Sequence, residues 1–418
     1  MRETQKYKQT EIGKIPRDWD VVKIEEIVEL INGRAFKPKE WSEKGLPIVR
    51  IQNFNDLSKP FNYCNFNVLQ EHIINQGDVL LAWSGTPGTS FGIHKWFGSK
   101  AVLNQHIFKV VFKSPRIGKD FFVLASNYKL NYLIAKAHGG AGLKHVTKDV
   151  VNQMQLPLPP LPEQKKIAEV LSTVDSAIQK VDEAIARTQR LKKGLMQELL
   201  TKGIGHKEFK NTEIGKIPKE WGMINISDIA EVKGGKRLPE GHQLIDSQTS
   251  YPYIRVVDFI NMTINVNNLK YLLPETHEII KQYIISVNDV YISIAGTVGI
   301  AGTIPKQLDG ANLTENAAKL CNLRNVSKMF LAYMLNSSIG QHQIASYIGK
   351  ATQPKLALFR IEKIKLPLPP LSEQKKIAEI LSSVDEKLGL LNKRKERFIN
   401  LKKGLMNELL TGKKRVKI

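Results

Sequence analysis

The chain has 418 residues, 42% hydrophobic and 24% charged, a balance typical of globular domains that excludes disordered and fibrous classes. Its 62 Lys and Arg against 40 Asp and Glu give a net charge of +22, which favours a polyanionic partner, nucleic acid first and an anionic membrane second. No apolar run approaches the roughly 20 residues of a spanning helix and the start is polar, so we expect a cytoplasmic protein without membrane attachment.

The first motif along the chain is TEIGKIPRDW, from Thr10 to Trp19. It returns as TEIGKIPKEW from Thr212 to Trp221, with eight of ten positions identical. Such self-similarity indicates a duplicated structural unit. We expect Trp19 and Trp221 to pack against the rest of each unit, and base stacking is the alternative.

Strand-like segments follow the motif in both copies. Pro47–Arg50 corresponds to Pro252–Arg255, and GDVLLAWSGTPG from Gly77 corresponds to NDVYISIAGTVG from Asn288. Both are β-branched runs bounded by Gly, Pro, Asp or Asn, which predicts strands that end in turns. The intervening sequences share only such scattered anchors. We therefore predict one mixed α/β fold for two globular heads, residues 1–155 and 204–365, with different surfaces.

Each head is followed by a nearly identical block. LPLPPLPEQKKIAEVLSTVD, from Leu156, returns as LPLPPLSEQKKIAEILSSVD, from Leu366, with seventeen of twenty positions identical. The prolines predict an extended strap. A helix is expected to begin near Glu163 and Glu373, where a carboxylate suits the first turn. The alternative role for these residues is the Glu-x-Lys half of a nuclease site.

The blocks lead into long amphipathic helices. Alternating steps of four and three from Ile167 and from Ile377 each meet eight apolar positions in ten, which predicts coiled-coil helices. A parallel pair would force the chain after Thr201 back along roughly 57 Å, whereas an antiparallel pair needs only a turn. We predict two antiparallel coiled-coil helices, in segments 156–203 and 366–418, joining the heads in a pseudo-twofold internal repeat. Gly194 and Gly404 indicate either close helix approach or fraying.

Motifs of enzyme chemistry are missing. The sequence contains no GxxxxGK[ST], GxGxxG or HExxH motif, and Cys64 and Cys321 lack metal-ligand spacing. We expect no catalytic residue, no metal and no cofactor in this chain.

The alternation of two TEIGKIP motifs, two divergent heads and two LPLPPL-x-EQKKIAE blocks resembles the specificity subunit of type I restriction-modification systems over essentially the whole chain. This resemblance implies two target recognition domains and two conserved spacer helices. It also implies assembly with two modification (methyltransferase) subunits and two restriction subunits, which hold S-adenosylmethionine and ATP, in phage defence. Two inverted, different heads would read an asymmetric bipartite target in double-stranded DNA. A specificity module of another phage-defence complex and a non-DNA coiled-coil adaptor remain as alternatives.

Candidate DNA contacts are Arg, Lys, His, Asn and Gln residues in predicted loops, because such side chains bind phosphates and base edges. Each could instead be an ordinary solvated surface group, and the shared Arg50 and Arg255 could be structural or phosphate-facing. The candidates are Arg34, Lys37, Arg50, Gln52, Asn53, Lys144 and His145 in the first head, and Lys236, Arg237, Arg255, Gln353 and Lys355 in the second.

Overall fold

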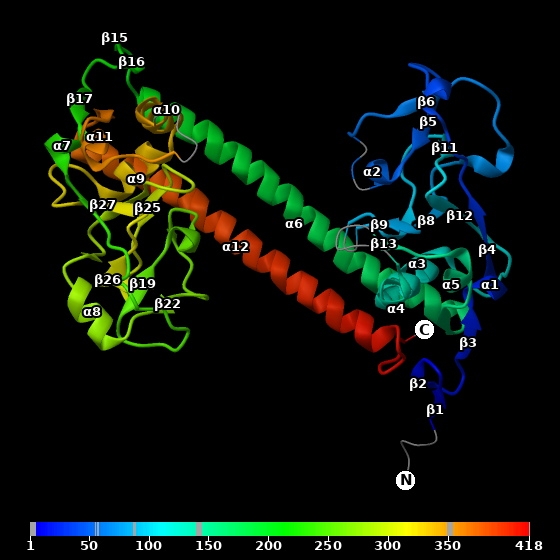
Figure 1. The fold of residues 1–418 in the computed structure, drawn as a ribbon. Coiled ribbons are helices and arrows are strands. Elements are labelled where there is room, and N and C mark those ends of the chain that lie inside the picture. Colours follow the sequence, from blue (N-terminus) through cyan, green and yellow to red (C-terminus); the bar gives the residue numbers. More distant parts are fainter. Residues whose placement is uncertain are drawn as a thin grey trace. The chain divides into compact units, whose positions relative to one another are not determined.

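The computed structural model describes residues 6–54, 56, 58–86, 89–138, 144–348 and 354–417. The chain forms two compact units (Figure 1). Unit 1 comprises residues 1–182 and 394–418, and unit 2 comprises residues 183–393. Each unit therefore contains one head together with part of both long helices, α6 (Leu161–Lys202) and α12 (Leu371–Leu409).

Head 1 is built on two four-stranded sheets. One has the antiparallel order β10 (Gly92–Lys95), β8 (Val79–Ala82), β12 (Ile107–Phe112), β4 (Val28–Asn32). The other has the order β6 (Asn62–Cys64), β5 (Leu46–Val49), β11 (Ala101–Leu103), β7 (Ile73–Ile74), and its β5–β11 pair is parallel. The remaining elements are β1 (Tyr7–Thr10), β2 (Gly13–Pro16), β9 (Ser84–Gly85), β13 (Lys144–His145), α1 (Ile24–Ile27), α2 (Ile51–Phe54), α3 (Lys119–Tyr128), α4 (Leu130–Lys136), α5 (Lys148–Asn152) and the 3-10 turns Pro38–Glu40 and Gln70–His72.

Head 2 repeats both sheets. Their orders are β25 (Ala301–Thr303), β24 (Val290–Ser293), β27 (Ala317–Cys321), β18 (Glu231–Gly234) and β22 (Lys270–Tyr271), β19 (Pro252–Ile254), β26 (Ala311–Leu313), β23 (Ile284–Ile285), again with one parallel pair, β19–β26. The prediction that both heads share one mixed fold is confirmed. Other elements of head 2 are β15 (Phe209–Thr212), β16 (Gly215–Pro218), β20 (Phe259–Ile260), β21 (Thr263–Ile264), α7 (Ile226–Ile229), α8 (Pro274–Ile280), α9 (Lys328–Asn336), α10 (Ser338–Tyr347), α11 (Leu358–Glu362) and the 3-10 turns Val256–Asp258 and Lys306–Leu308.

The proline-rich straps are extended, as predicted. Strand β14 (Gln155–Leu158) pairs with β3 (Asp20–Lys23), and β28 (Lys365–Leu368) pairs with β17 (Gly222–Asn225). The long helices begin at Leu161 and Leu371, two residues before the predicted position. The strap thus fastens the start of each helix to the strand that follows the TEIGKIP motif.

The repeated tryptophans join each head to a long helix. Trp19 is fully buried, and its indole N–H donates to Glu163 Oε2 at 2.9 Å. Trp221 is equally buried and donates to Glu373 Oε2 at 3.1 Å. Packing is therefore confirmed and base stacking is excluded for both rings. The nuclease alternative also fails. The Glu163 carboxylate is 0% exposed and held by Trp19 and by Arg415, whose Nε donates to Oε1 at 2.6 Å. The Glu373 carboxylate is held by Trp221 and by His206, whose Nε2 lies 2.9 Å from Oε1.

The glutamine after each glutamate completes this junction. Gln164 Oε1 accepts from Gly118 N at 2.8 Å, and its Nε2 donates to Arg116 O at 2.7 Å. Gln374 binds Ser327 N and Asn325 O in the same way in unit 2. The Glu-Gln pair is thus a buried connector to the head and more than a helix start with a favourable dipole.

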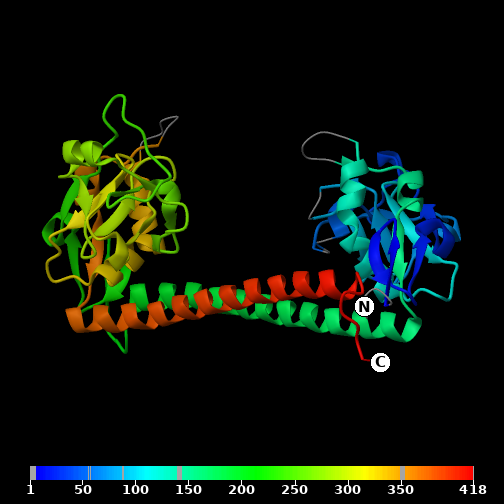
Figure 2. The same ribbon diagram turned by 90° about the horizontal axis from the view of Figure 1, so that it is seen from below.

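Within each unit the segments of α6 and α12 pack side by side (Figure 2). In unit 1, Lys402 Nζ lies 2.6 Å from Asp175 Oδ1, and Lys395 Nζ lies 2.6 Å from Asp182 Oδ1. Seven residues forward on α6 match seven residues back on α12, so the predicted antiparallel packing is confirmed. In unit 2, Lys192 pairs with Asp385 at 2.6 Å. Three lysines occupy positions in the four-three pattern that are not apolar, namely Lys192, Lys395 and Lys402, and all three are therefore ion-paired across the helices.

Two sequence questions about the helices are also answered. A Cβ added at Gly194 or Gly404 would meet no described atom within 4 Å, so neither glycine marks a close approach. Across the described part of the chain, no helix is long and apolar enough to cross a bilayer.

Candidate DNA interface

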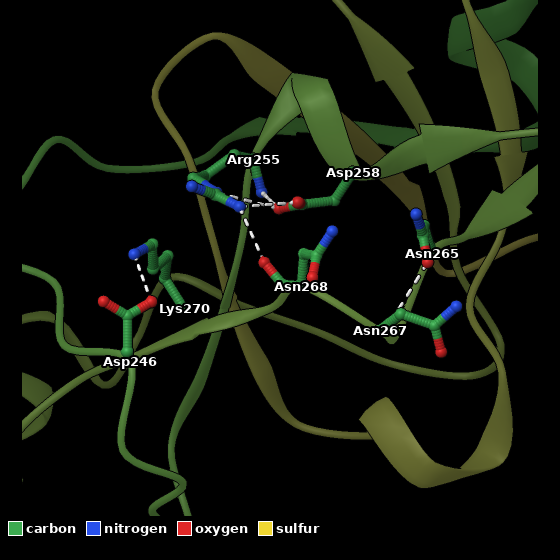
Figure 3. Close-up of polar contacts among 7 residues, drawn as sticks. All are labelled: Asp246, Arg255, Asp258, Asn265, Asn267, Asn268 and Lys270. Atoms are coloured by element: carbon green, nitrogen blue, oxygen red, sulfur yellow. Dashed lines mark hydrogen bonds and ion pairs between the residues drawn. The ribbon is translucent and has the colours of Figure 1, made fainter. Parts of the chain in front are cut away.

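Arg255 follows β19 in head 2 and is bound within its own turn (Figure 3). Its Nε and Nη2 donate to the two carboxylate oxygens of Asp258 at 3.0 and 2.8 Å, and Nη2 also donates to Asn268 O at 3.0 Å. The hydrogen bonds from Arg255 to Asp258 raise the pKa of the guanidinium above its ordinary value. Figure 3 also shows Lys270 paired with Asp246 beside this cluster. Arg255 thus closes a turn, as the structural alternative proposed.

Arg237 is held differently. Its Nε donates to Glu315 Oε1 at 3.0 Å, and its side chain is 80% exposed. Lys236, the preceding residue, is exposed and its Nζ lies 5.4 Å from the centre of the Tyr283 ring. The Nε atom of Arg237 is therefore fixed by Glu315, while most of the side chain is exposed to solvent.

A groove of about 730 Å³ brings Arg237 together with Lys355. Val257, Gly296, Thr297 and Pro354 are among its other lining residues. Lys355 is exposed, and its backbone forms an isolated antiparallel β-bridge with Ala295. The next residue, Leu356, donates its N–H to Ile294 O at 2.9 Å. Gln353 lies outside the described residues.

In head 1 the loop after β4 contains Arg34 and Lys37. Arg34 Nη2 donates to Glu40 Oε1 at 2.5 Å, and its guanidinium lies over the rings of Phe36 and Phe66 at 4.9 and 4.8 Å. The backbone N–H of Lys37 binds Glu40 Oε2 at 2.7 Å, and the Lys37 side chain is exposed. Hydrogen bonds from Lys37 and Arg34 lower the pKa of Glu40. Arg34 is thus mainly engaged within the protein, whereas the Lys37 side chain faces solvent.

The turn after β5 contains three candidate DNA contacts, Arg50, Gln52 and Asn53, which differ in exposure and in their contacts. Asn53 is 0% exposed, accepts from Arg50 N at 3.1 Å and donates to Lys59 O at 3.2 Å, so its amide closes the turn inside the protein. Gln52 is exposed and makes a 3.3 Å hydrogen bond to Pro60 O. The Arg50 guanidinium lies 5.4 Å from the Trp41 ring centre, and its buried Nε has no hydrogen-bond partner among the described residues.

Lys144 and His145 form β13, which pairs with β9 in the register Lys144–Gly85 and His145–Ser84. Val146 N donates to Trp83 O at 3.0 Å, as Leu356 N donates to Ile294 O in head 2, so His145 corresponds to Lys355. The Trp83 ring lies 6.2 Å from His145 and 5.2 Å from His106. Burial, and to a smaller extent the nearby His145, lower the pKa of His106.

Sequence reasoning missed the turns that face these loops, Asn104–His106 between β11 and β12 and Thr314–Asn316 between β26 and β27. The same pattern surrounds both turns, in Ala101–Lys109 and in Ala311–Lys319. It consists of Ala-x-Leu, the three turn residues, and a lysine as the third residue of the next strand. That lysine bonds to the carbonyl of Ile73 or Ile284 at 2.6 Å. The shared pattern was present in the sequence and marks the position of Glu315.

The comparisons with known proteins agree on one family. A family model described as type I restriction modification DNA specificity domain matches residues 16–186 and 218–398. The chain is 30% identical to the type I restriction enzyme MjaVIII specificity subunit of Methanocaldococcus jannaschii, over 97% of this chain and 95% of that protein. It is 22% identical to the EcoBI specificity subunit of Escherichia coli, over 94% and 86% of the two chains.

Solved structures agree on the fold. The crystal structure of the type I restriction-modification S subunit from M. genitalium matches with a TM-score of 0.60 at 16% identity, over 94% of this chain and 96% of that chain. A chain from a structural study of complex assembly and conformational transition in the type I system matches with a TM-score of 0.56 at 17% identity, over 95% and 99%.

Proposed function

The chain belongs to the specificity subunits of type I restriction-modification systems, and from this we propose that its two heads read the two halves of one asymmetric, bipartite target in double-stranded DNA. In this proposal residues 1–155 and 204–365 are the target recognition domains. Residues 156–203 and 366–418 are the spacer helices, which set the number of unread base pairs between the half-sites. The net charge of +22 supports binding to a phosphate backbone.

The observation that carries the proposal is that equivalent backbone positions in the two heads present different side chains. Arg34 N donates to Leu103 O at 2.8 Å, and Lys236 N donates to Leu313 O at 2.9 Å, which identifies equivalent positions. The next residue is Ala35 in head 1 but Arg237 in head 2. Two heads with one fold and different side chains in their loops are suited to two different half-sites.

The geometry divides the candidate contacts into two groups. Arg34, Asn53 and Arg255 are engaged inside the protein, and we assign them to loop support. We propose that the remaining candidates contact DNA: Lys37, Arg50, Gln52, Lys144, His145, Lys236, Arg237, Gln353 and Lys355.

We assign the chemistry to partners. Among the described residues no group of three or more His, Cys, Asp or Glu side chains is arranged to hold a metal ion. The family membership supports placing methyl transfer and S-adenosylmethionine in two modification subunits, and ATP-dependent cleavage in two restriction subunits. This chain is then a non-catalytic subunit that works in the cytoplasm, where the host DNA lies.

Methylation mapping tests the proposal most directly. The full chain is expressed with its modification partners in a host that lacks other adenine methyltransferases, and modified positions are mapped across the genome. We expect one motif made of two short, different blocks around an unread spacer. A continuous or palindromic motif, or methylation that does not depend on this chain, would refute the proposal.

A further inference from the structure

We infer that Glu315 is a positioning residue that holds Arg237 so that the exposed edge of its guanidinium reads a guanine in the major groove. The inference rests on the proposed function, and it assigns one base pair of the target to one residue pair of head 2. Arg237 was a candidate contact in the sequence, whereas Glu315 was not.

The contacts of Arg237 favour a directed donor. Nε is bound to Glu315, which leaves the terminal N–H groups of a guanidinium that carries five N–H donors in a planar fork. Among the described residues, Glu315 is the only hydrogen-bond partner of the Arg237 side chain, which is 80% exposed. The free edge of such a fork matches the O6 and N7 acceptors of guanine.

Glu315 is itself fixed by the turn between β26 and β27. Its Oε2 accepts from Thr314 Oγ1 at 3.0 Å and lies 3.4 Å from the hydroxyl of Tyr253. Burial tends to raise the pKa of Glu315, but the hydrogen bonds from Arg237, its own backbone and Thr314 outweigh it, so the pKa lies below the ordinary value. The side chain therefore remains a carboxylate that holds the arginine.

The backbone before Arg237 is fixed as well. The Tyr253 hydroxyl donates to Lys236 O at 2.8 Å, and burial raises the pKa of Tyr253 to about 12, so the donor keeps its proton. A Cβ added at Gly235 would lie 2.1 Å from Thr314 O, which shows how closely this backbone approaches the turn. Both ends of Arg237 are thus positioned before DNA binds, which reduces the ordering cost of recognition.

The carboxylate of Glu315 beside Arg237 fits a contact from Arg237 to a DNA base better than a contact to a phosphate. Glu315 offsets the positive charge of Arg237 and would repel a phosphate, so the pair contributes little to counterion release. The acceptor edge of guanine carries no net charge and meets no such repulsion. Val257, 79% exposed on the same groove, offers an apolar surface for a neighbouring base.

Head 1 provides an internal control. Its equivalent positions are Ala35 and Gln105, and Gln105 Oε1 is buried without a partner among the described residues. Guanine recognition by this residue pair therefore belongs to head 2 alone. A change at Glu315 should alter one half-site and leave the other unchanged.

The test uses the full chain assembled with its modification partners, and compares E315Q and R237K with the unmodified chain by methylation mapping and by DNA binding at several salt concentrations. We expect both variants to lose preference for one guanine in one half-site by about 5- to 150-fold, the range of one good bidentate contact. The other half-site should stay unchanged in both variants, and R237K, which keeps the positive charge, should leave the salt slope unchanged. E278Q is the matched control, because Glu278 forms an exposed pair with Lys281 elsewhere in head 2, and it should leave the motif intact.

Each other outcome has a defined meaning. An unchanged motif in both E315Q and R237K overturns the inference and leaves the proposed function standing. A loss of affinity that is uniform across sequences, without a change in base preference, assigns Arg237 to a phosphate and also overturns it. If E315Q fails to fold, the result for R237K alone tests the inference, since this variant keeps Glu315 and the positive charge at position 237. If the unmodified chain gives no bipartite motif, the proposed function itself fails.

Discussion

The contacts of Arg415, in the C-terminal segment of unit 1, lead to a specific prediction about stability. Arg415 donates to Glu163 from Nε and Nη2 at 2.6 and 2.7 Å, and to Asp18 from Nη1 and Nη2 at 2.9 and 2.7 Å. Its guanidinium also lies 5.8 Å from the Trp19 ring centre. Arg415→Ala removes these contacts and leaves the carboxylate of Glu163, which is 0% exposed, with Trp19 as its partner.

The magnitude follows from the burial of each partner. Breaking a fully buried ion pair costs about 3–5 kcal/mol, and an exposed pair contributes about 0–1 kcal/mol. Arg415 is 41% exposed while Glu163 is buried, so this pair lies between the two limits. We expect Arg415→Ala to lower the free energy of unfolding of unit 1 by about 2–3 kcal/mol.

Tryptophan fluorescence during denaturant unfolding can measure this loss. Four of the five tryptophans, Trp19, Trp41, Trp83 and Trp96, lie in unit 1, so the signal reports mainly that unit. Lys414→Ala is the matched control, because Lys414 pairs with Glu408 at the surface with 72% of its side chain exposed. It should cost no more than about 1 kcal/mol.

A double-mutant cycle separates the pair from its surroundings. Glu163→Gln keeps an acceptor for Trp19 but removes the charge, so the double variant should lose clearly less stability than the two single variants added together. Equal, small effects of Arg415→Ala and Lys414→Ala would refute the view that the C-terminal segment holds the head to its helix.

Further predictions concern the helices, pH and DNA. Gly194→Ala and Gly404→Ala should each raise stability by about 1 kcal/mol, because the new Cβ meets no described atom, whereas Gly235→Ala should lower it; thermal melting checks both signs. Burial lowers the pKa of His94 below its ordinary value of 6.5, so below that pH the unfolded chain binds a proton that the folded chain does not. Stability should therefore fall as pH drops from 7 towards 5, and less steeply in His94→Gln, as denaturant midpoints would show. Lys355→Glu should weaken DNA binding and reduce its salt slope by about one; an unchanged slope would remove this loop from the interface.

The sequence predicted most of the fold because the relevant signals are local or repeated. Proline spacing predicted the straps, the four-three periodicity predicted the helices, and the short link after Thr201 predicted their antiparallel packing. The junction was only partly predictable. The pairs Trp19–Glu163 and Trp221–Glu373 join residues 144 and 152 positions apart, and no periodic pattern connects them. That both members recur in both copies was the available signal.

The candidate interface was harder to predict because exposure and pairing depend on tertiary contacts. Asn53 has the right chemistry for a base but lies in the core, and Arg255 is used by Asp258. Glu315 has the charge that argues against DNA binding, yet it positions the most exposed arginine candidate. Residue type therefore gave candidate loops, but it could not show which of their side chains are held by contacts within the protein.

The shared Arg50 and Arg255 occupy corresponding turns but differ in their side-chain contacts. Both arginines follow a strand, and in both the backbone N–H is bound by a side chain three residues later, Asn53 or Asp258. The amide of Asn53 closes the turn without neutralising Arg50, whose guanidinium lies over Trp41. The carboxylate of Asp258 closes the turn and also binds the guanidinium of Arg255. Because a neutralised arginine attracts phosphate weakly, we expect Arg50 to be better suited than Arg255 to a phosphate contact.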